Sequence, residues 1–174
     1  MALEIAGSRV LAPFFGGSIF VWGSLIGIFL GAMSGGYWLG GWLSERWPQS
    51  ALLNTLLAAA GAYTALLPLW AGPLCRALAG GPGAVVDLGP RLGPLTASLV
   101  LFALPSVLMG VASPFAVRLL AVDLTRVGAV AGRLAAVGTL GSIVGTLATA
   151  FWLIPALGVS TILTAIGVLL MAAA

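Results

Sequence analysis

Residues 10–44 read VLAPFFGGSIFVWGSLIGIFLGAMSGGYWLGGWLS, thirty-five positions without a charged side chain. As one continuous helix they would measure about 50 Å, because an α-helix rises ~1.5 Å per residue. The hydrocarbon core of a bilayer is only ~30 Å thick. A charge-free run of this length predicts a membrane-spanning helix.

Glycine recurs at every fourth position within this run. These glycines are Gly23, Gly27, Gly31 and Gly35. Residues spaced by four share a helix face, so that face carries no side chains and another helix backbone can approach it closely. A second stripe of small residues in a later span includes Gly141 and Gly145. We expect the two glycine-rich helices to pack together, either within one chain or between two copies.

The composition of the whole chain also favours a membrane protein. The chain is 61% hydrophobic and 6% charged, with a mean hydropathy of +1.19, so its main expected partner is the lipid bilayer. Seven arginines and four acidic residues give a formal charge of +3. Because these arginines are scattered, they form no basic stripe, and we do not expect nucleic acid as a partner. The N-terminus, with Glu4 and no basic region, does not resemble a signal peptide.

The uncharged runs predict an all-α fold, a polytopic integral membrane helical bundle with one transmembrane domain over residues 1–174. We expect five full transmembrane helices and one short N-terminal helix. The full spans are expected at residues 18–43, 51–70, 94–112, 129–153 and 159–174. The short helix, residues 2–12, would measure roughly 16 Å, too little to cross a bilayer. We interpret it either as the second half of a truncated helix or as a half-inserted segment.

Proline and glycine residues set the predicted breaks between these helices. Pro13 is expected to end the short helix, and residues 154–158 to form the turn between the last two spans. Pro105 is expected to bend its helix. Trp22 and Trp42 lie twenty residues apart, roughly 30 Å along a helix. We therefore expect one tryptophan at each membrane interface.

Arginine counts predict the orientation in the membrane. Four arginines lie in or beside the loops 44–50 and 113–128, and two lie in the opposite loop, 71–93. The positive-inside rule then places the first two loops and the C-terminus on the cytoplasmic side and makes 71–93 an outer loop. We expect the membrane to be a bacterial-type cytoplasmic membrane.

Charged residues gather at the predicted cytoplasmic ends of the helices. They are Glu45, Arg46, Arg118, Asp123, Arg126 and Arg133. Glu45 is unfavourable at the negative end of its own helix, so we expect it to pair with Arg118 or Arg126. Asp123 and Arg126 are spaced i, i+3 on an expected interfacial helix that begins after Pro114. We interpret this cluster as fixing the loop geometry, and a gating role is the alternative.

Three polar residues within or beside the apolar segments are candidates for an intramembrane ligand site. Glu4 and Arg9 are charged, and an ionisable group left unpaired in hydrocarbon costs about 3 kcal/mol. Asn54 lies within a predicted span. The alternative is that Glu4 and Arg9 meet lipid headgroups. Without histidine, and with Cys75 as the only cysteine, the sequence predicts no catalytic constellation, no metal site and no cofactor.

Several segments resemble the membrane domain of membrane-bound spermidine synthase-like proteins. Residues 2–16, ALEIAGSRVLAPFFG, resemble the start of that domain. Later matches are GRL at 132–134, TLGSIVGT at 139–146 and LIPALG at 153–158. Residues 41–46 also resemble the cytoplasmic loop motif of the major facilitator superfamily, with Glu45 where an aspartate is usual. The resemblance spans nearly the whole chain and implies a half-facilitator-like helical domain.

Members of the spermidine synthase-like family often carry a cytoplasmic aminopropyltransferase domain. The resemblance implies a non-catalytic membrane module that anchors or serves such a soluble transferase and handles polyamines. It also implies a first helix that starts upstream of Met1. A second hypothesis is a half-size transporter for polyamines or other small solutes that works as a homodimer. A third is an accessory subunit of a larger membrane complex.

Overall fold

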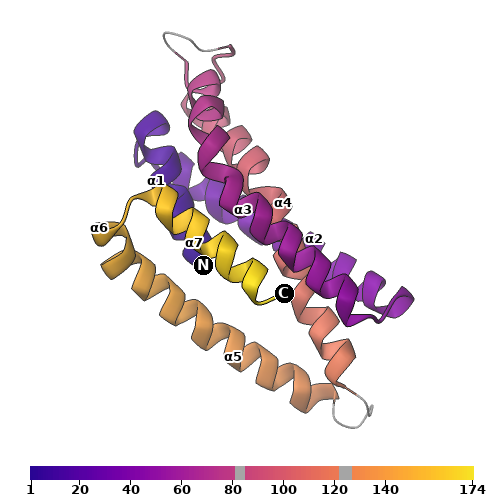
Figure 1. Cartoon of the computed structure of the whole chain (residues 1–174). Helices are drawn as coiled ribbons and strands as arrows, with labels where there is room; N and C mark the ends of the chain where they lie inside the picture. Colours follow the sequence, from indigo (N-terminus) through magenta and orange to yellow (C-terminus); the bar gives the residue numbers. More distant parts are fainter. Residues whose placement is uncertain (81–84, 122–126) are drawn as a thin grey trace.

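The computed structural model describes residues 1–80, 85–121 and 127–174 of the chain (Figure 1). Within these ranges the regular elements are helices, apart from one isolated β-bridge between Ala79 and Asp87. The helices are α1 (Ala2–Phe15), α2 (Ile19–Arg46), α3 (Ser50–Leu78), α4 (Gly89–Leu120), α5 (Val127–Ala148), the π-helix η2 (Thr149–Leu153), α6 (Ile154–Ala156) and α7 (Val159–Ala172). The predicted all-helical fold is confirmed.

Four helical segments of the described chain are long and apolar enough to cross a membrane. They are Ile19–Arg46, Ser50–Leu78, Gly89–Leu120 and Val127–Ala156. The fifth predicted span corresponds to α7, which has 14 residues and measures only about 21 Å. The structure therefore supports a helical membrane bundle, and the predicted count of five full spans is not confirmed.

Three prolines lie inside helices, close to the predicted helix ends. Pro13 lies inside α1, Pro73 lies inside α3, and Pro114 lies inside α4. Consequently α3 extends to Leu78 and α4 runs from Gly89 to Leu120, so the predicted loops are much shorter. No separate helix begins after Pro114, because α4 continues through it. A proline costs a helix one backbone hydrogen bond, whereas a helix end leaves several backbone groups unpaired in lipid.

The predicted break near Pro155 is confirmed. Leu157 and Gly158 both adopt extended backbone conformations, with ψ angles of 151° and 150°. These two residues end α6 and allow α7 to turn back along the bundle (Figure 1).

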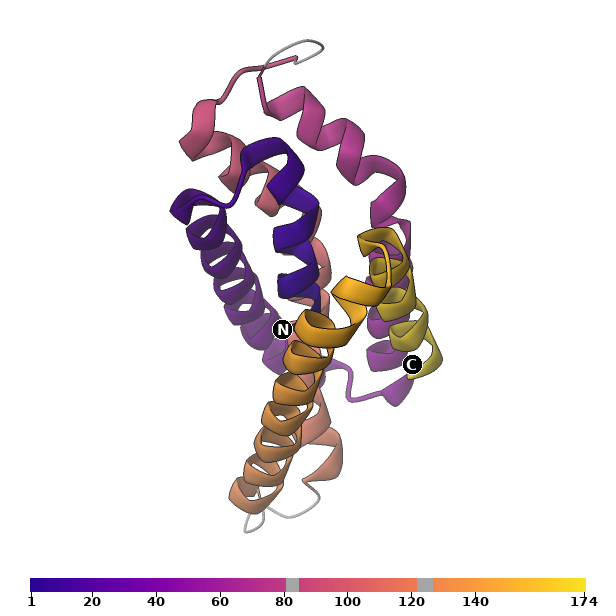
Figure 2. The same ribbon diagram turned by 90° about the vertical axis from the view of Figure 1, so that its left-hand side faces the viewer.

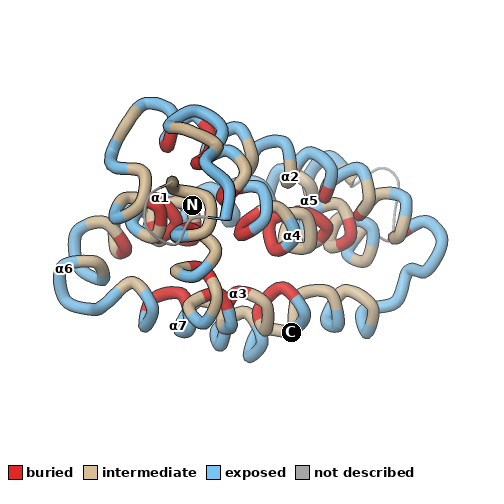
Figure 3. The backbone as a smooth tube through the Cα atoms, turned by 90° about the horizontal axis from the view of Figure 1, so that it is seen from above, coloured by how far each residue is buried: buried red, intermediate tan, exposed pale blue. Residues whose placement is uncertain are grey.

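The core of the bundle lies around α4, which packs against α2 on one side and α3 on another (Figure 2). Phe102 of α4 is fully buried, and its ring stacks on Phe29 of α2 with 5.6 Å between the ring centroids. On the α3 side, the Tyr63 hydroxyl donates a 2.9 Å hydrogen bond to the Val100 carbonyl. Buried residues are concentrated where these helices face one another (Figure 3).

Backbone-to-backbone contact at glycines brings α2 and α4 together. A Cβ atom added to Gly36 would collide with the Val107 carbonyl oxygen and lie 2.9 Å from the Gly110 Cα. One turn later, a Cβ on Gly40 would lie 2.7 Å from the Val111 carbonyl oxygen. These distances leave no room for a side chain, as in other small-residue interfaces between membrane helices.

A second glycine contact joins α3 and α7. A Cβ atom on Gly61 would lie 2.6 Å from the Gly167 carbonyl oxygen, and a Cβ on Gly167 would collide with the Gly61 carbonyl oxygen. Both glycines are buried. The short α7 is thus held against a long span by reciprocal backbone contact.

Candidate functional site

The predicted glycine stripe of α2 does not pack within the chain. Gly23, Gly27, Gly31 and Gly35 are exposed, and a Cβ on any of them would have no described neighbouring atom within 4 Å. The packed glycines are instead Gly36 and Gly40. Adjacent residues point about 100° apart around a helix, so the two sets of glycines occupy different faces. Within-chain packing through the predicted stripe is therefore wrong, and packing between copies stays a prediction.

The later glycine stripe is also open. A Cβ on Gly141 would meet nothing within 4 Å, and one on Gly145 would meet only the Ala2 Cβ, at 3.8 Å. Both glycines belong to α5, which has no buried residue along its whole length. The two predicted stripes thus do not pair with each other in this chain.

The span that contains α5 is the least packed of the four. Only 6% of its most apolar window is buried, against 44% for Gly89–Leu120. Figure 1 shows α5 along the outer edge of the bundle. A cavity of about 390 Å³ lies between Met1 and one face of α5, where Thr139, Ser142 and Thr146 line it. Ile143 and Leu147 line the same cavity, so this face of α5 carries three hydroxyl groups among apolar side chains and has little contact with the rest of the chain.

At one end of the bundle, Arg46 packs on two tryptophan rings. Its guanidinium carbon lies 5.7 Å from the centre of the Trp42 ring and 5.6 Å from that of Trp47. The two rings meet edge to face, with centroids 6.0 Å apart. A guanidinium held over aromatic faces gains cation–π attraction. Arg46 therefore interacts with tryptophans at the end of its own helix.

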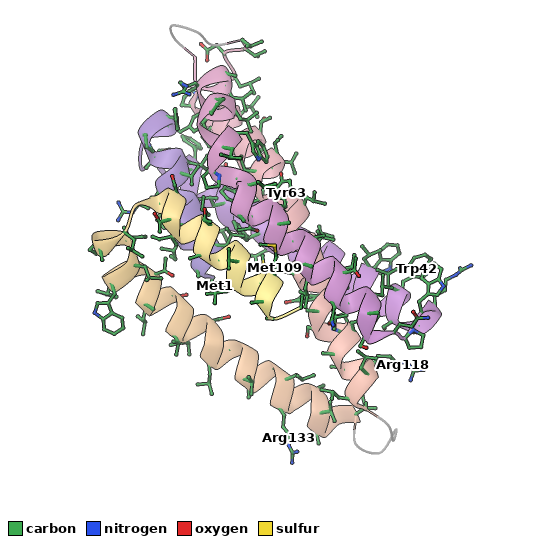
Figure 4. All side chains as sticks on the ribbon, viewed as in Figure 1. Met1, Trp42, Tyr63, Met109, Arg118 and Arg133 are labelled. Carbon is green, nitrogen blue, oxygen red and sulfur yellow. The ribbon has the colours of Figure 1, made fainter. Side chains whose placement is uncertain are left out.

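The predicted ion-pair cluster is not assembled among the described residues. Glu45 is exposed and forms no ion pair with Arg118, although Trp42 and Arg118 lie toward the same end of the bundle (Figure 4). Arg133 extends from α5 away from the other helices (Figure 4). The remaining members, Asp123 and Arg126, lie outside the described residues. Pairing of Glu45 with Arg126 stays a prediction.

Arg9 lines a cavity of about 280 Å³ at the junction of α1, α2 and η2. Four residues of α1 form one wall, and their spacing of i, i+3, i+4 and i+7 places them on one helix face. They are Ile5, Ser8, Arg9 and Ala12. Gly16 and Gly17 close the end of the cavity, and Trp22 and Ala150 line it from the other two elements. We call it the Arg9 cavity.

The other two candidate ligand residues lie elsewhere. Glu4 is half-buried in the first turn of α1, and Asn54 is exposed near the start of α3. Neither residue is among those that line the Arg9 cavity. Of the three candidates, only Arg9 faces a cavity that the structure defines. The described residues contain no cluster of three His, Cys, Asp or Glu side chains suited to a metal ion.

Sequence reasoning missed two polar residues that are next in sequence to residues lining the Arg9 cavity. Ser18 follows Gly17, and Thr149 precedes Ala150. The hydroxyl groups of both residues are buried without a hydrogen-bond partner. It also missed the packing glycines at Gly36 and Gly110. Single hydroxyls and glycines are common in membrane helices, so only the spacing of Gly36 and Gly40 offered a signal.

No protein-family model, curated protein or solved structure matches this chain. The resemblance to spermidine synthase-like membrane domains therefore stays a prediction.

Proposed function

We propose that this chain is a non-catalytic membrane module that works by associating with another protein in or at the bilayer. The observation that carries this proposal is the exposure of α5. This helix belongs to an apolar 30-residue span, but it buries no residue against its own chain.

The chemistry of the α5 face supports a protein partner. Thr139, Ser142 and Thr146 share one side of the helix and line the cavity beside Met1. Small and hydroxylated residues are enriched where membrane helices pack together, because they permit close approach and donate hydrogen bonds across the interface.

The family resemblance makes the proposed partner more specific. We propose a cytoplasmic transferase of the aminopropyltransferase type, which the module would anchor at the membrane. This finer assignment rests on residues 2–16 and 132–158 alone.

Site-directed crosslinking tests the association. With Cys75→Ala as the background, Ser142→Cys on the polar face is expected to crosslink to another polypeptide in native membranes. Val144→Cys is the matched control, because Val144 is 66% exposed and lies about 160° round the helix from Ser142. Mass spectrometry of the crosslinked band would identify a transferase, another membrane protein or a second copy of the chain. Equal crosslinking from both positions, or none from either, would reject the proposed interface.

A second candidate function is that of a half-size solute carrier built from two copies. The observation in its favour is the open stripe from Gly23 to Gly35, which would let two copies of α2 approach closely. Flux of labelled polyamine into proteoliposomes tests this candidate, with Glu4→Gln expected to reduce it. Absence of flux from the intact chain would reject it.

A further inference from the structure

We propose that the Arg9 cavity binds the phosphate group of an amphiphile, with an anionic phospholipid as the natural ligand. This inference goes beyond the proposed association and does not depend on it. It rests on the charge and the apolar walls of one cavity.

The charge of the cavity favours an anion. Arg9 is the only charged residue that lines it, and no ion pair to Arg9 forms among the described residues. Arg9 is exposed at the surface of the bundle, and a guanidinium that meets hydrocarbon there is unfavourable unless an anion or a polar group compensates it. Its planar fork of donors matches phosphate oxygens well. The same positive charge disfavours a polyamine at this position.

A buried hydroxyl without a partner belongs to Thr149, which does not line the cavity itself but is next in sequence to a residue that does. Threonines elsewhere in the spans donate to the carbonyl four residues back, as Thr64 does to Ala60 at 2.7 Å and Thr139 to Ala135 at 2.8 Å. Thr149 is 1% exposed, and its hydroxyl has no partner. It begins the π-helix η2, where the chain departs from α-helical hydrogen bonding. Its neighbour Ala150 lines the cavity.

The N-terminus of α2 also favours an anion in the cavity. Ser18 is the N-cap residue of this 28-residue helix, but its side chain makes no capping hydrogen bond. Helix N-termini favour anions, because their free N–H groups and the helix dipole are positive there. Gly17, Val21 and Trp22, from this end of α2, line the cavity. The backbone N–H groups of Val21 and Trp22 already donate to the Ser18 carbonyl, so the helix dipole is the contribution of α2 here.

The apolar walls distinguish an amphiphile from a free ion. Ile5, Val21 and Ile154 line the cavity beside Arg9, and Trp22 is a residue type enriched at the level of lipid headgroups. A phosphodiester with acyl chains would satisfy the polar and the apolar parts together. A free organic phosphate would satisfy only the polar part.

Lipid titration of the purified full chain tests this site by native mass spectrometry. The probes are dihexanoyl phosphatidylglycerol, dihexanoyl phosphatidylcholine and glycerol phosphate. We expect the phosphatidylglycerol to bind best, and Arg9→Gln to weaken it by about tenfold or more, the size expected for a lost charge-assisted hydrogen bond. Arg133→Gln is the matched control, since it removes the same charge from an exposed site on α5, and it should leave binding within about twofold.

A second variant covers the case in which Arg9→Gln does not fold. Ala12→Leu retains the guanidinium but fills part of the cavity, and it should also reduce phosphatidylglycerol binding, while Arg9→Lys should retain part of it. Binding of glycerol phosphate as strong as that of the lipid would support the phosphate site and assign it a soluble ligand. Equal binding of the two lipids, or binding unchanged in both Arg9→Gln and Ala12→Leu, would overturn the proposal.

Discussion

Gly36 of α2 and Gly110 of α4 face each other so closely that neither position has room for a side chain. A Cβ atom on Gly110 would lie 3.1 Å from the Gly36 Cα and 2.9 Å from the Met33 carbonyl oxygen. The two helices thereby gain dispersion contacts along their backbones. These contacts matter in a bilayer, because surrounding lipid weakens the hydrophobic contribution to helix association.

Replacing Gly36 with leucine should separate α2 from α4. Overpacking a closely packed interface costs about 1–3 kcal/mol, so we expect a clear fall in the midpoint of thermal unfolding, measured by size-exclusion chromatography of heated detergent samples. Gly35→Leu is the matched control, because a Cβ on Gly35 meets open space. If both variants lost the same stability, this packing of α2 would be incorrect.

The contact between α3 and α7 gives a parallel prediction at Gly61. A side chain there would meet the Gly167 carbonyl oxygen, so Gly61→Leu should displace α7 and increase its proteolysis. Gly72→Leu lies on the same helix, where the nearest described atom is the Arg76 Nη2 at 4.0 Å, and it should be cleaved like the unmodified chain. Protection of Gly61→Leu at the level of the control would contradict the reciprocal contact.

Cysteine accessibility should distinguish the two glycine faces of α2. With Cys75→Ala as the background, Gly27→Cys should react with a membrane-permeant maleimide, and any disulfide it forms should join two chains. Gly40→Cys should react slowly, because Val111 and Pro114 occupy that space. Mass shifts on denaturing gels report both reactions. Rapid labelling at Gly40 together with protection at Gly27 in the isolated monomer would reverse the assignment of faces.

The hydrogen bond from Tyr63 to the Val100 carbonyl should contribute measurably to the stability of the bundle. A typical intramolecular hydrogen bond contributes about 1 kcal/mol, so Tyr63→Phe should lower the unfolding free energy by roughly that amount. Tyr37→Phe removes the same hydroxyl from an exposed ring and serves as the control. Chemical unfolding in mixed micelles, followed by tryptophan fluorescence, measures the difference. Identical curves for the two variants would show that the Tyr63 bond adds nothing.

Part of the candidate site was predictable from the sequence, and part was not. An arginine beside a long apolar run has an unfavourable transfer free energy, so the sequence by itself identified Arg9 as a candidate. The rest of the cavity was not predictable, because Ala150 and Ile154, which also line it, lie far from Arg9 along the chain. The unpartnered hydroxyl of Thr149 is likewise a property of the folded chain.

The helix ends show the same division. A charge-free run predicts a span because each residue contributes its own transfer free energy, whatever its neighbours do. Prolines such as Pro73 and Pro114 break helices in water, yet α3 and α4 continue through them. Ending a helix inside lipid would leave several backbone groups unpaired, whereas a proline removes one hydrogen bond, so the surroundings of the proline decide whether the helix continues.

Sequence alone determined that this protein is helical and belongs in a membrane, since charge, apolarity and helix length are summed residue by residue. Only the tertiary structure decided which side of each helix meets another. The Gly35–Gly36 pair offers two adjacent bare faces, and the position of α4 places Gly36 inside and leaves Gly35 open. Contact between helices depends on residues distant in the chain, so a repeat within one helix cannot specify it.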